Sequence, residues 1–405
     1  MVQDPDGPDE PRFAETAREA LTDAGSRSRL RQESARRRAR RDAAVGELSD
    51  WEGLRDAGAR RRDAVLYDLE ARLLQLEAEV SAAGGRLHWA RDPAEAADLV
   101  TRLEKDAGSA VRLPGPLLAE LSLTAPPTGA GEVEAEMVVF GVDAVVAESA
   151  TVVVLGAAAV RRVARAATVV AVAGIDQVLG DWADLEVWLQ LRARSDGERM
   201  SPAVATLCGT APGDGPRSFH LVLIDGGRSD ALADPAGRTA LWCIGCAACA
   251  DVCPVYERVG PAGYPGHRAG PAGAVRTPLL EGTRGTAAAS LPFASTLCGA
   301  CGDVCPVRID VPELLLRLRG RVVDERRANP LPGPELLAMQ GLEWVLGDAA
   351  RMETAQRAGS RWARLAGRTG RIRRLPGLLA RWTDARDLPA PPRETFRAWW
   401  RRRRR

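Results

Sequence analysis

The 405-residue sequence contains almost no lysine and little histidine or aromatic side chain. Lys105 is the only lysine, so nearly all of its 56 basic residues are arginine, a bias that coding composition explains more simply than phosphate recognition does. These cations face 54 carboxylates, which leaves a net charge of only +2. Because such a small bulk charge does not attract a polyanion, we expect no nucleic-acid partner.

Long uncharged apolar stretches are also missing. The most apolar region, 150–175, contains Arg161, Arg162 and Arg165, which would be costly in hydrocarbon. The first eleven residues are acidic and contain prolines, without the basic head and apolar stretch of a secretory leader. We therefore expect a cytoplasmic protein with no transmembrane segment.

The first part of the chain has a helical composition. Residues 13–83 are rich in Ala, Arg, Glu and Leu, and they predict an N-terminal helical region over 1–85 in which residues 1–12 are disordered. Apolar residues at alternating three- and four-residue intervals predict one helix face: Leu66, Leu69, Leu73, Leu76 and Val80. This run is too short for a coiled coil, so we expect the face to pack on the protein's own body.

Short apolar runs that alternate with helical stretches follow, and they predict a small α/β domain over 86–228. This length leaves room for only about five strands. The expected elements are strands near 87–90, 110–113, 137–142, 151–155, 168–172 and 219–224, helices at 93–105 and 184–194, and a Pro- and Gly-rich loop at 124–131. A cysteine-rich region at 229–330 and a helical, arginine-rich tail at 331–405 complete an α+β multidomain protein.

Seven of the eight cysteines fall in two compact motifs. They read Cys243-x2-Cys246-x2-Cys249-x3-Cys253-Pro254 and Cys298-x2-Cys301-x3-Cys305-Pro306. Three thiolates at short intervals on a tight loop reach three corners of one cubane, whereas the thiolate three residues further on points to the other cluster. The sequence therefore predicts two iron–sulfur clusters in a helical, ferredoxin-like domain over 229–330. The expected ligands are Cys243, Cys246, Cys249 and Cys305 for cluster 1, and Cys253, Cys298 and Cys301 for cluster 2.

Zinc and disulfides are the alternatives for a chain with these cysteines. Zinc takes four ligands in two pairs that are further apart in sequence, so four cysteines within eleven residues that end in Cys-Pro suit a cubane better. Disulfide frameworks belong to small secreted domains, whereas this chain is large and its cysteines are clustered.

The second motif lacks one thiol, because Ser295 stands where a fourth cysteine would precede Cys298. Three readings are open. Cluster 2 is a 3Fe–4S cluster, or it is a 4Fe–4S cluster with serine, water or substrate on the fourth iron, or Cys208 completes it. A lone cysteine is most often a small apolar packing residue, so we interpret Cys208 in that way.

Few other residues are candidates for chemistry. His88 and His220 adjoin expected strands and are interpreted as core or surface residues. His267, in the loop between the motifs, is the strongest candidate for a ligand among the three histidines. Glu148 is the only carboxylate placed like a functional group at a loop tip, and we interpret it as a solvated acid. The sequence contains no Ser-His-Asp order and no phosphate-binding glycine loop, so it identifies no catalytic residue.

The surroundings of the cysteines resemble one known family. They read Cys253-Pro-Val-Tyr256, Gly270-Pro-Ala-Gly-Ala-Val-Arg-Thr-Pro278-Leu-Leu280, Leu297-Cys-Gly-Ala-Cys301 and Val304-Cys-Pro-Val307. Further segments of the same kind are Val146-Ala-Glu-Ser149, Ala173-Gly-Ile175, Leu221-Val-Leu-Ile-Asp225, Trp382-Thr-x-x-Arg386-Asp-x-Pro389 and Phe396-Arg-x-Trp399-Trp400. Over nearly its whole length the chain thus resembles the iron–sulfur protein family of the bacterial lactate-utilization system, the ferredoxin-type component, in which a second motif with three cysteines is usual.

Four segments depart from the pattern of that family. The α/β domain is shortened between Leu123 and Met137, and Glu148-Ser-Ala150 stands in place of Glu-Thr-Gly. The loop before the last strand is eroded at Cys208–Pro216, and Pro261-Ala-Gly-Tyr264 replaces a stretch that contains histidine. All four departures spare the cysteine motifs.

The resemblance implies an electron relay rather than a stand-alone catalyst. It would be a subunit of a cytoplasmic complex that oxidises L-lactate to pyruvate, together with a cysteine-rich subunit and a small α/β subunit. The residues alone indicate a two-cluster electron carrier with an attached α/β domain. Two alternatives are an iron–sulfur subunit of another 2-hydroxy-acid or quinone-linked dehydrogenase, and a structural or regulatory iron–sulfur protein.

Overall fold

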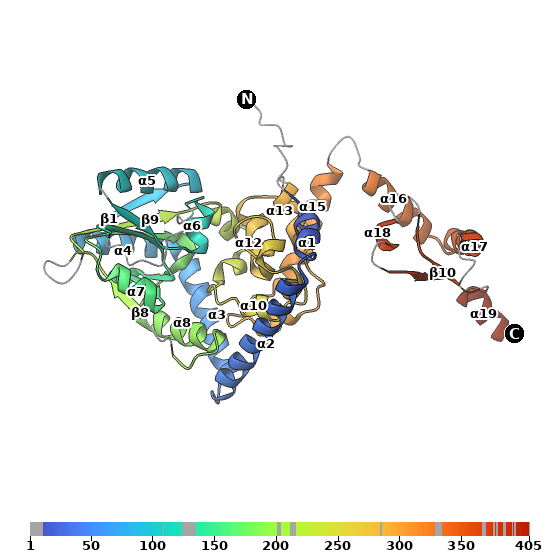
Figure 1. Cartoon of the computed structure of the whole chain (residues 1–405), viewed down its shortest axis with the longest axis horizontal. Helices are drawn as coiled ribbons and strands as arrows, with labels where there is room; N and C mark the ends of the chain where they lie inside the picture. Colours follow the sequence, from blue (N-terminus) through green and yellow to red (C-terminus); the bar gives the residue numbers. More distant parts are fainter. Residues whose placement is uncertain are drawn as a thin grey trace, which may run out of the picture. The chain divides into compact units, whose positions relative to one another are not determined.

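The computed structural model describes most of the chain, in two compact units, Met1–Val322 and Val323–Arg405. The described residues are 11–107, 109–123, 135–200, 204–210, 216–283, 286–328, 334–366, 370–375, 377, 380–383, 386–390, 392 and 394–404. The loop expected at 124–131 and nearly all of the start expected to be disordered lie outside them. Each unit is described by itself, and the mixture of helices and strands confirms the α+β class (Figure 1).

Four helices open the larger unit: α1 (Phe13–Ala20), α2 (Ala24–Gly46), α3 (Trp51–Tyr67) and α4 (Leu69–Ala82). Aspartates begin two of them, because the side chain of Asp23 accepts a hydrogen bond from Ser26 N at 2.9 Å and that of Asp50 accepts one from Gly53 N at 2.8 Å. The predicted apolar face lies in the core with the residues of a sheet, as expected, although it crosses from α3 into α4.

A five-stranded parallel sheet forms the centre of the α/β region, in the order β1-β9-β6-β3-β2. Its strands are β1 (Arg86–Ala90), β2 (Ala110–Arg112), β3 (Met137–Gly141), β6 (Thr168–Gly174) and β9 (Ser218–Ile224). Val169 and Ala171 of β6 pack toward the core that contains α4, and Val170 and Val172 pack toward the core that contains α5 (Pro93–Asp106). Helices therefore cover both faces, which explains why these strands are continuous apolar runs (Figure 1).

A second sheet of four strands shows that the expectation of about five strands is wrong. Its order is β7-β4-β5-β8, with β4 (Ala144–Val146), β5 (Thr151–Leu155), β7 (Val178–Leu179) and β8 (Val204–Leu207). The strand expected at 151–155 belongs to this sheet rather than to the central one. The other three are only two to four residues long, too short for their alternation to stand out in the sequence.

The cysteine region is helical and shares a core with the α/β region. It contains the 3-10 turn η3 (Arg238–Trp242), then α10 (Ala248–Asp251), α11 (Tyr256–Val259), α12 (Gly270–Leu280), α13 (Thr286–Ser290), α14 (Ala300–Val304) and α15 (Val311–Arg327). Trp188 and Leu191 of α8 (Trp182–Ser195) lie in one buried cluster with Ile244, Val307 and Leu315. The cysteines are thus fixed against the sheet-bearing part of the unit.

The second unit consists mainly of helices. It contains α16 (Pro334–Leu346), α17 (Ala349–Ala366), α18 (Ala380–Thr383) and α19 (Phe396–Arg403), with a short antiparallel pair, β10 (Arg371–Ile372) and β11 (Leu388–Pro389). Glu353 of α17 pairs with Arg401 of α19 at 2.5 Å. Among the described residues of the whole chain, no helix has both the length and the apolar character needed to span a bilayer.

Candidate metal centre

Four of the predicted ligands meet at one cavity. Cys243 follows η3, Cys246 lies in the loop, Cys249 is in α10, and Cys305 ends α14. All four border a cavity of about 520 Å³. Burial raises the pKa of the Cys246 thiol to about 12, and the neighbouring thiols of Cys243 and Cys305 add to this rise. We call these four residues the first thiol group.

Three further cysteines, Cys253, Cys298 and Cys301, form the second thiol group. Burial raises the pKa of Cys301 to about 11, and the nearby thiols of Cys253 and Cys298 raise it further. Cys253 and Cys301 are buried, whereas Cys298 is exposed. The structure therefore places Cys305 near Cys246 of the first motif and Cys253 near Cys301 of the second, and the crossed ligation of two clusters stays a prediction.

The two cysteine loops have the same backbone design. Gly245 and Ala247 flank Cys246 with positive φ angles of 70° and 58°, and Leu297 and Gly299 flank Cys298 with φ angles of 54° and 90°. Left-handed conformations at alanine and leucine are unfavourable and persist only where the surroundings impose them. The short helices α10 and α14 that follow the loops pack against each other.

Backbone amides point at the sulfur of the last cysteine in each motif. Cys253 Sγ accepts a hydrogen bond from Tyr256 N at 3.5 Å, and Cys305 Sγ accepts one from Ile309 N at 3.4 Å. The buried Tyr264 hydroxyl lies next to the Cys253 thiol, and its interaction with that sulfur acts to lower the pKa of Cys253. Donors of this kind stabilise sulfur that carries negative charge.

Ser295 lies before the second loop at the place that Cys243 takes before the first. Its hydroxyl accepts a hydrogen bond from Leu297 N at 3.1 Å, and its carbonyl accepts one from Arg319 Nη2 at 2.9 Å. The side chain therefore helps to shape the second loop. Its oxygen is a hard donor, which suits a soft iron–sulfur site less well than a thiolate does.

Arginines from distant helices surround the first thiol group. Arg55 of α3 donates to the Cys305 carbonyl through Nε at 3.0 Å and Nη2 at 2.8 Å. Arg62 of α3 donates to the Leu241 carbonyl at 2.9 Å, and Arg276 of α12 donates to the Ala240 carbonyl at 3.2 Å. Arg62 and Arg276 both lie close enough to the Cys243 thiol for their charges to interact with it. Sequence analysis missed these residues, because nothing local distinguishes them from the many other arginines.

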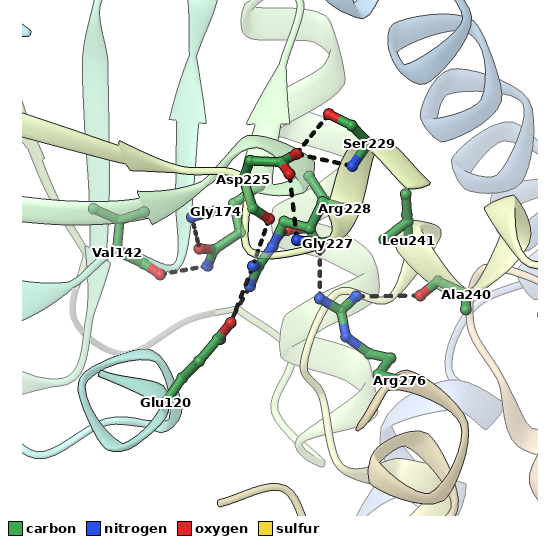
Figure 2. Close-up of polar contacts among 12 residues, drawn as sticks. Glu120, Val142, Gly174, Asp225, Gly227, Arg228, Ser229, Ala240, Leu241 and Arg276 are labelled. Atoms are coloured by element: carbon green, nitrogen blue, oxygen red, sulfur yellow. Dashed lines mark hydrogen bonds and ion pairs between the residues drawn. The ribbon is translucent and has the colours of Figure 1, made fainter. Parts of the chain in front are cut away.

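Arg276 also belongs to a network of ion pairs that includes Arg228 and Glu120, and Figure 2 labels these three residues. Asp176, in the 3-10 turn η2 (Ile175–Gln177) after β6, pairs with Arg276 at 2.6 Å and with Arg228, the first residue of α9 (Arg228–Ala233). Arg228 also holds Glu120, at the end of α6 (Pro116–Glu120), by two hydrogen bonds of 3.1 Å. Burial alone would raise the pKa of Glu120, but Arg228 and Arg268 outweigh it and hold that pKa below its usual value.

The residues present fit iron–sulfur clusters. Thiolates are the soft ligands that such clusters take, and all four cysteines of the first thiol group line the same cavity. Within the described residues, no three His, Cys, Asp or Glu side chains converge on the position of a single metal ion. Thiolates that hold a cubane surround a body of several atoms and do not converge on one point.

The remaining sequence candidates lie elsewhere or have structural roles. The interpretation of Cys208 as a packing residue is wrong, because Cys208 is exposed. It follows β8, an edge strand of the second sheet, where the chain reaches the surface. His88 Nε2 lies 2.9 Å from His220 Nδ1 across β1 and β9, and the exposed Glu148 accepts a hydrogen bond from Trp182 N at the start of α8. His267 borders the cavity.

Comparisons with known proteins agree with this geometry. Residues 239–309, which include both thiol groups, match the family described as 4Fe-4S dicluster domain. Lactate utilization protein B of Exiguobacterium sp. is 30% identical over 97% of this chain and 97% of its own length. The protein of the same name from Anoxybacillus flavithermus is 31% identical over 94% of each chain. The Bacillus licheniformis protein is 40% identical over 58% of this chain and 50% of its own.

Two further results concern length and fold. The alignment with the Exiguobacterium protein spans 464 positions, so that protein carries segments that this 405-residue chain lacks. A solved DUF162 family protein from Deinococcus radiodurans is similar to 40% of this chain over 98% of its own, at 18% identity and a TM-score of 0.28, which supports no inference about fold. The near-complete coverage by the Exiguobacterium relative confirms the resemblance seen in the sequence, and the chain belongs to the lactate utilization protein B family.

Proposed function

We propose that this protein is the iron–sulfur electron-transfer subunit of a cytoplasmic complex that oxidises L-lactate to pyruvate. The observation that carries the proposal is the gathering of seven thiols into two groups within one folded unit. The names of the relatives support the substrate. An iron–sulfur cluster supplies the transfer of single electrons, which a relay between a dehydrogenase and an acceptor requires.

In this proposal the two thiol groups are the ligand sets. Cys243, Cys246, Cys249 and Cys305 hold cluster 1, and Cys253, Cys298 and Cys301 hold cluster 2. The amides of Tyr256 and Ile309 stabilise the charge on the sulfurs that they approach, and buried Ile244, Val307 and Ile309 exclude water. We take both clusters as 4Fe–4S, with 3Fe–4S as the alternative for cluster 2.

The partners follow from the same family. We propose a cysteine-rich subunit and a small α/β subunit as companions, with this chain as relay rather than as the site of lactate oxidation. Reconstitution tests this arrangement. L-lactate should reduce the clusters only when the companion subunits are present, and a deletion strain should lose growth on L-lactate. Reduction by another 2-hydroxy acid or by a quinol, with none by L-lactate, would support the alternative dehydrogenases, and clusters that no donor reduces would support a structural or regulatory role.

Metal analysis of the full chain tests the foundation of the proposal. Anaerobically reconstituted protein should contain about seven to eight irons per chain and a similar amount of acid-labile sulfide, with negligible zinc. Cys208→Ala is the matched control, because this exposed cysteine lies outside both groups and its loss should leave the iron content unchanged. Stoichiometric zinc without sulfide would refute the proposal.

A further inference from the structure

The cavity beside the first thiol group extends well beyond the cysteines. Its wall includes 113–117, which follow β2, then 140–143 at the end of β3, and Asp176 and Gln177 after β6. These segments follow parallel neighbouring strands, so they meet at the same edge of the central sheet. In open α/β sheets, ligands bind in the crevice outside the carboxyl ends of the strands. The cavity volume of about 520 Å³ includes the space that cluster 1 would fill beside its four cysteines, and the part of the cavity along these segments lies beyond them.

Charged side chains of alternating sign, buried or half-buried, follow one another along this wall, and Figure 2 labels Arg276, Arg228 and Glu120 among them. Arg276 is nearest the thiols and is followed by Asp176, Arg228 and Glu120, and the series ends at Arg268, which lies before α12. The side chains of Asp176 and Arg228 are each only 2% exposed. Three guanidinium groups thus share two buried carboxylates. Polar groups this deeply buried at the wall of a cavity mark a candidate binding site.

Arg268 shares its buried carboxylate partner, Glu120, with Arg228. Burial lowers the pKa of Arg268 to about 10 despite Glu120, whereas the pKa values of Arg228 and Arg276 are raised. Glu281 is a weak second partner, because it is half exposed and lies 3.9 Å from Arg268 Nη1. Arg62, at the thiol end, also has a lowered pKa, which burial causes, but it faces Cys243 and the anionic thiolates of cluster 1 would compensate it. The charges that act most strongly on Arg268 are those of Glu120, Arg276 and Arg228.

His267 supplies a neutral donor beside this cation. Burial, reinforced by Arg268, lowers the pKa of His267 to about 4, so the ring is uncharged at neutral pH. Arg268 Nη1 lies 2.7 Å from His267 Nε2 and has only hydrogens to offer, so Nε2 accepts and the ring proton lies on Nδ1. The lining of the cavity therefore combines a guanidinium that shares its carboxylate partner with an imidazole that carries its proton on Nδ1. A planar guanidinium matches the two oxygens of a carboxylate.

We propose that this cavity binds a small monocarboxylate anion, with its carboxylate on Arg268 and the rest of the molecule toward the first thiol group. A dianion such as phosphate suits the site less well, because Glu120 and Asp176 lie in the same wall. The choice of a 2-hydroxy or 2-oxo acid as the occupant rests on the proposed function. A substrate or product bound at such a site would lie beside cluster 1 and could change its electronic properties.

Calorimetry on the cluster-loaded full chain tests this site, with L-lactate and pyruvate as probes. Propane-1,2-diol, which lacks the carboxylate, and inorganic phosphate are the ligand controls. The wild type should bind at least one of the two acids and neither control. Arg268→Gln should weaken that binding at least about tenfold, or 1.4 kcal/mol. Arg321→Gln is the matched control, because Arg321 pairs with Asp234 at the surface outside the cavity, and it should bind like the wild type.

Two further measurements keep the test decisive. Arg268→Lys retains the positive charge but lacks the planar guanidinium, so its affinity for the acid should also fall. It is used in place of Arg268→Gln if the Gln variant fails to load its clusters. The acid should alter the electron paramagnetic resonance of cluster 1 and leave that of cluster 2 unchanged. No binding by the wild type, tighter binding of phosphate, or equal affinity in the Arg268 variants would overturn the proposal. If the chain transfers electrons but binds no acid, the proposed relay function stands and the proposed binding site fails. If the chain binds the acid but transfers no electrons, the binding site stands and the relay function fails.

Discussion

The two thiol groups are built on the same loop but lie in different surroundings. The first has four cysteines, borders the cavity, and receives arginines from α3 and α12. The second has three cysteines, with Cys298 exposed and Ser295 in the place of a fourth thiol. Burial is the main cause of the raised pKa values of Cys253 and Cys301, and Arg319 reaches this loop at the Ser295 carbonyl.

This difference shows that local sequence and distant packing control separate properties. The loop decides where thiolates point, and it does so in the same way in both groups. Segments far away in the sequence decide how much positive charge and how much water each group meets. The direction of the thiols within one loop is therefore a local property, whereas the arrival of the thiol from the other motif, the reduction potential and the retention of iron depend on the rest of the unit.

Replacing the last cysteine of each motif should have the largest effect on the two clusters. Cys305→Ser should remove or damage cluster 1, and Cys253→Ser should damage cluster 2, because each of these thiols lies with the loop of the other motif. Resolved electron paramagnetic resonance signals of the two clusters provide the measurement. Cys208→Ala, in which neither signal should change, controls for the loss of a cysteine as such. Damage to the same cluster in both serine variants would contradict the crossed assignment.

The absence of a fourth thiol in the second group should have an intermediate effect, which concerns how firmly cluster 2 holds its fourth iron. We expect cluster 2 to lose one iron on mild oxidation and to regain it on reduction with added iron, because a hydroxyl or water binds that corner more weakly than a thiolate does. The three-iron resonance after brief oxidation measures this loss. Ser295→Cys should suppress it if the new thiol reaches the open corner, while Cys208→Ala should leave it unchanged. A wild type that never shows this resonance would contradict the assignment of three thiolates to cluster 2.

Removing an arginine should have the smallest effect and should be confined to cluster 1. Arg62→Gln and Arg276→Gln each remove a buried cation beside Cys243, so the reduced, more negative cluster should become less stable. We expect its midpoint potential to fall by at least about 59 mV, a tenfold change for one electron. A spectroscopic redox titration measures both clusters in the same sample. Equal shifts of both potentials, or the same shift in Arg321→Gln, would show that the arginines have no specific role.

Sequence reasoning located features that depend on neighbouring residues. The apolar run at 168–172 predicted a strand, and the structure shows that this strand is buried on both faces of a parallel sheet. The cysteine spacing predicted two groups because a tight loop fixes where its thiols point. Sequence reasoning missed β4, β7 and β8, whose two to four residues give no clear periodicity. The positions of Arg55, Arg62 and the Asp176 network could not be predicted, because they depend on how helices from distant parts of the chain pack.

The contact between Arg55 and the Cys305 carbonyl has a consequence for the order of biosynthesis. These two residues are 250 positions apart, so the ribosome completes α3 long before it adds the last thiol of the first group. Contacts between such distant segments form late in folding. A nascent chain that has just exposed Cys243, Cys246 and Cys249 offers three thiols and none of the enclosure that α14 and α15 later provide. We therefore expect cluster 1 to be inserted after the larger unit has been translated, when the N-terminal helices have already been synthesised.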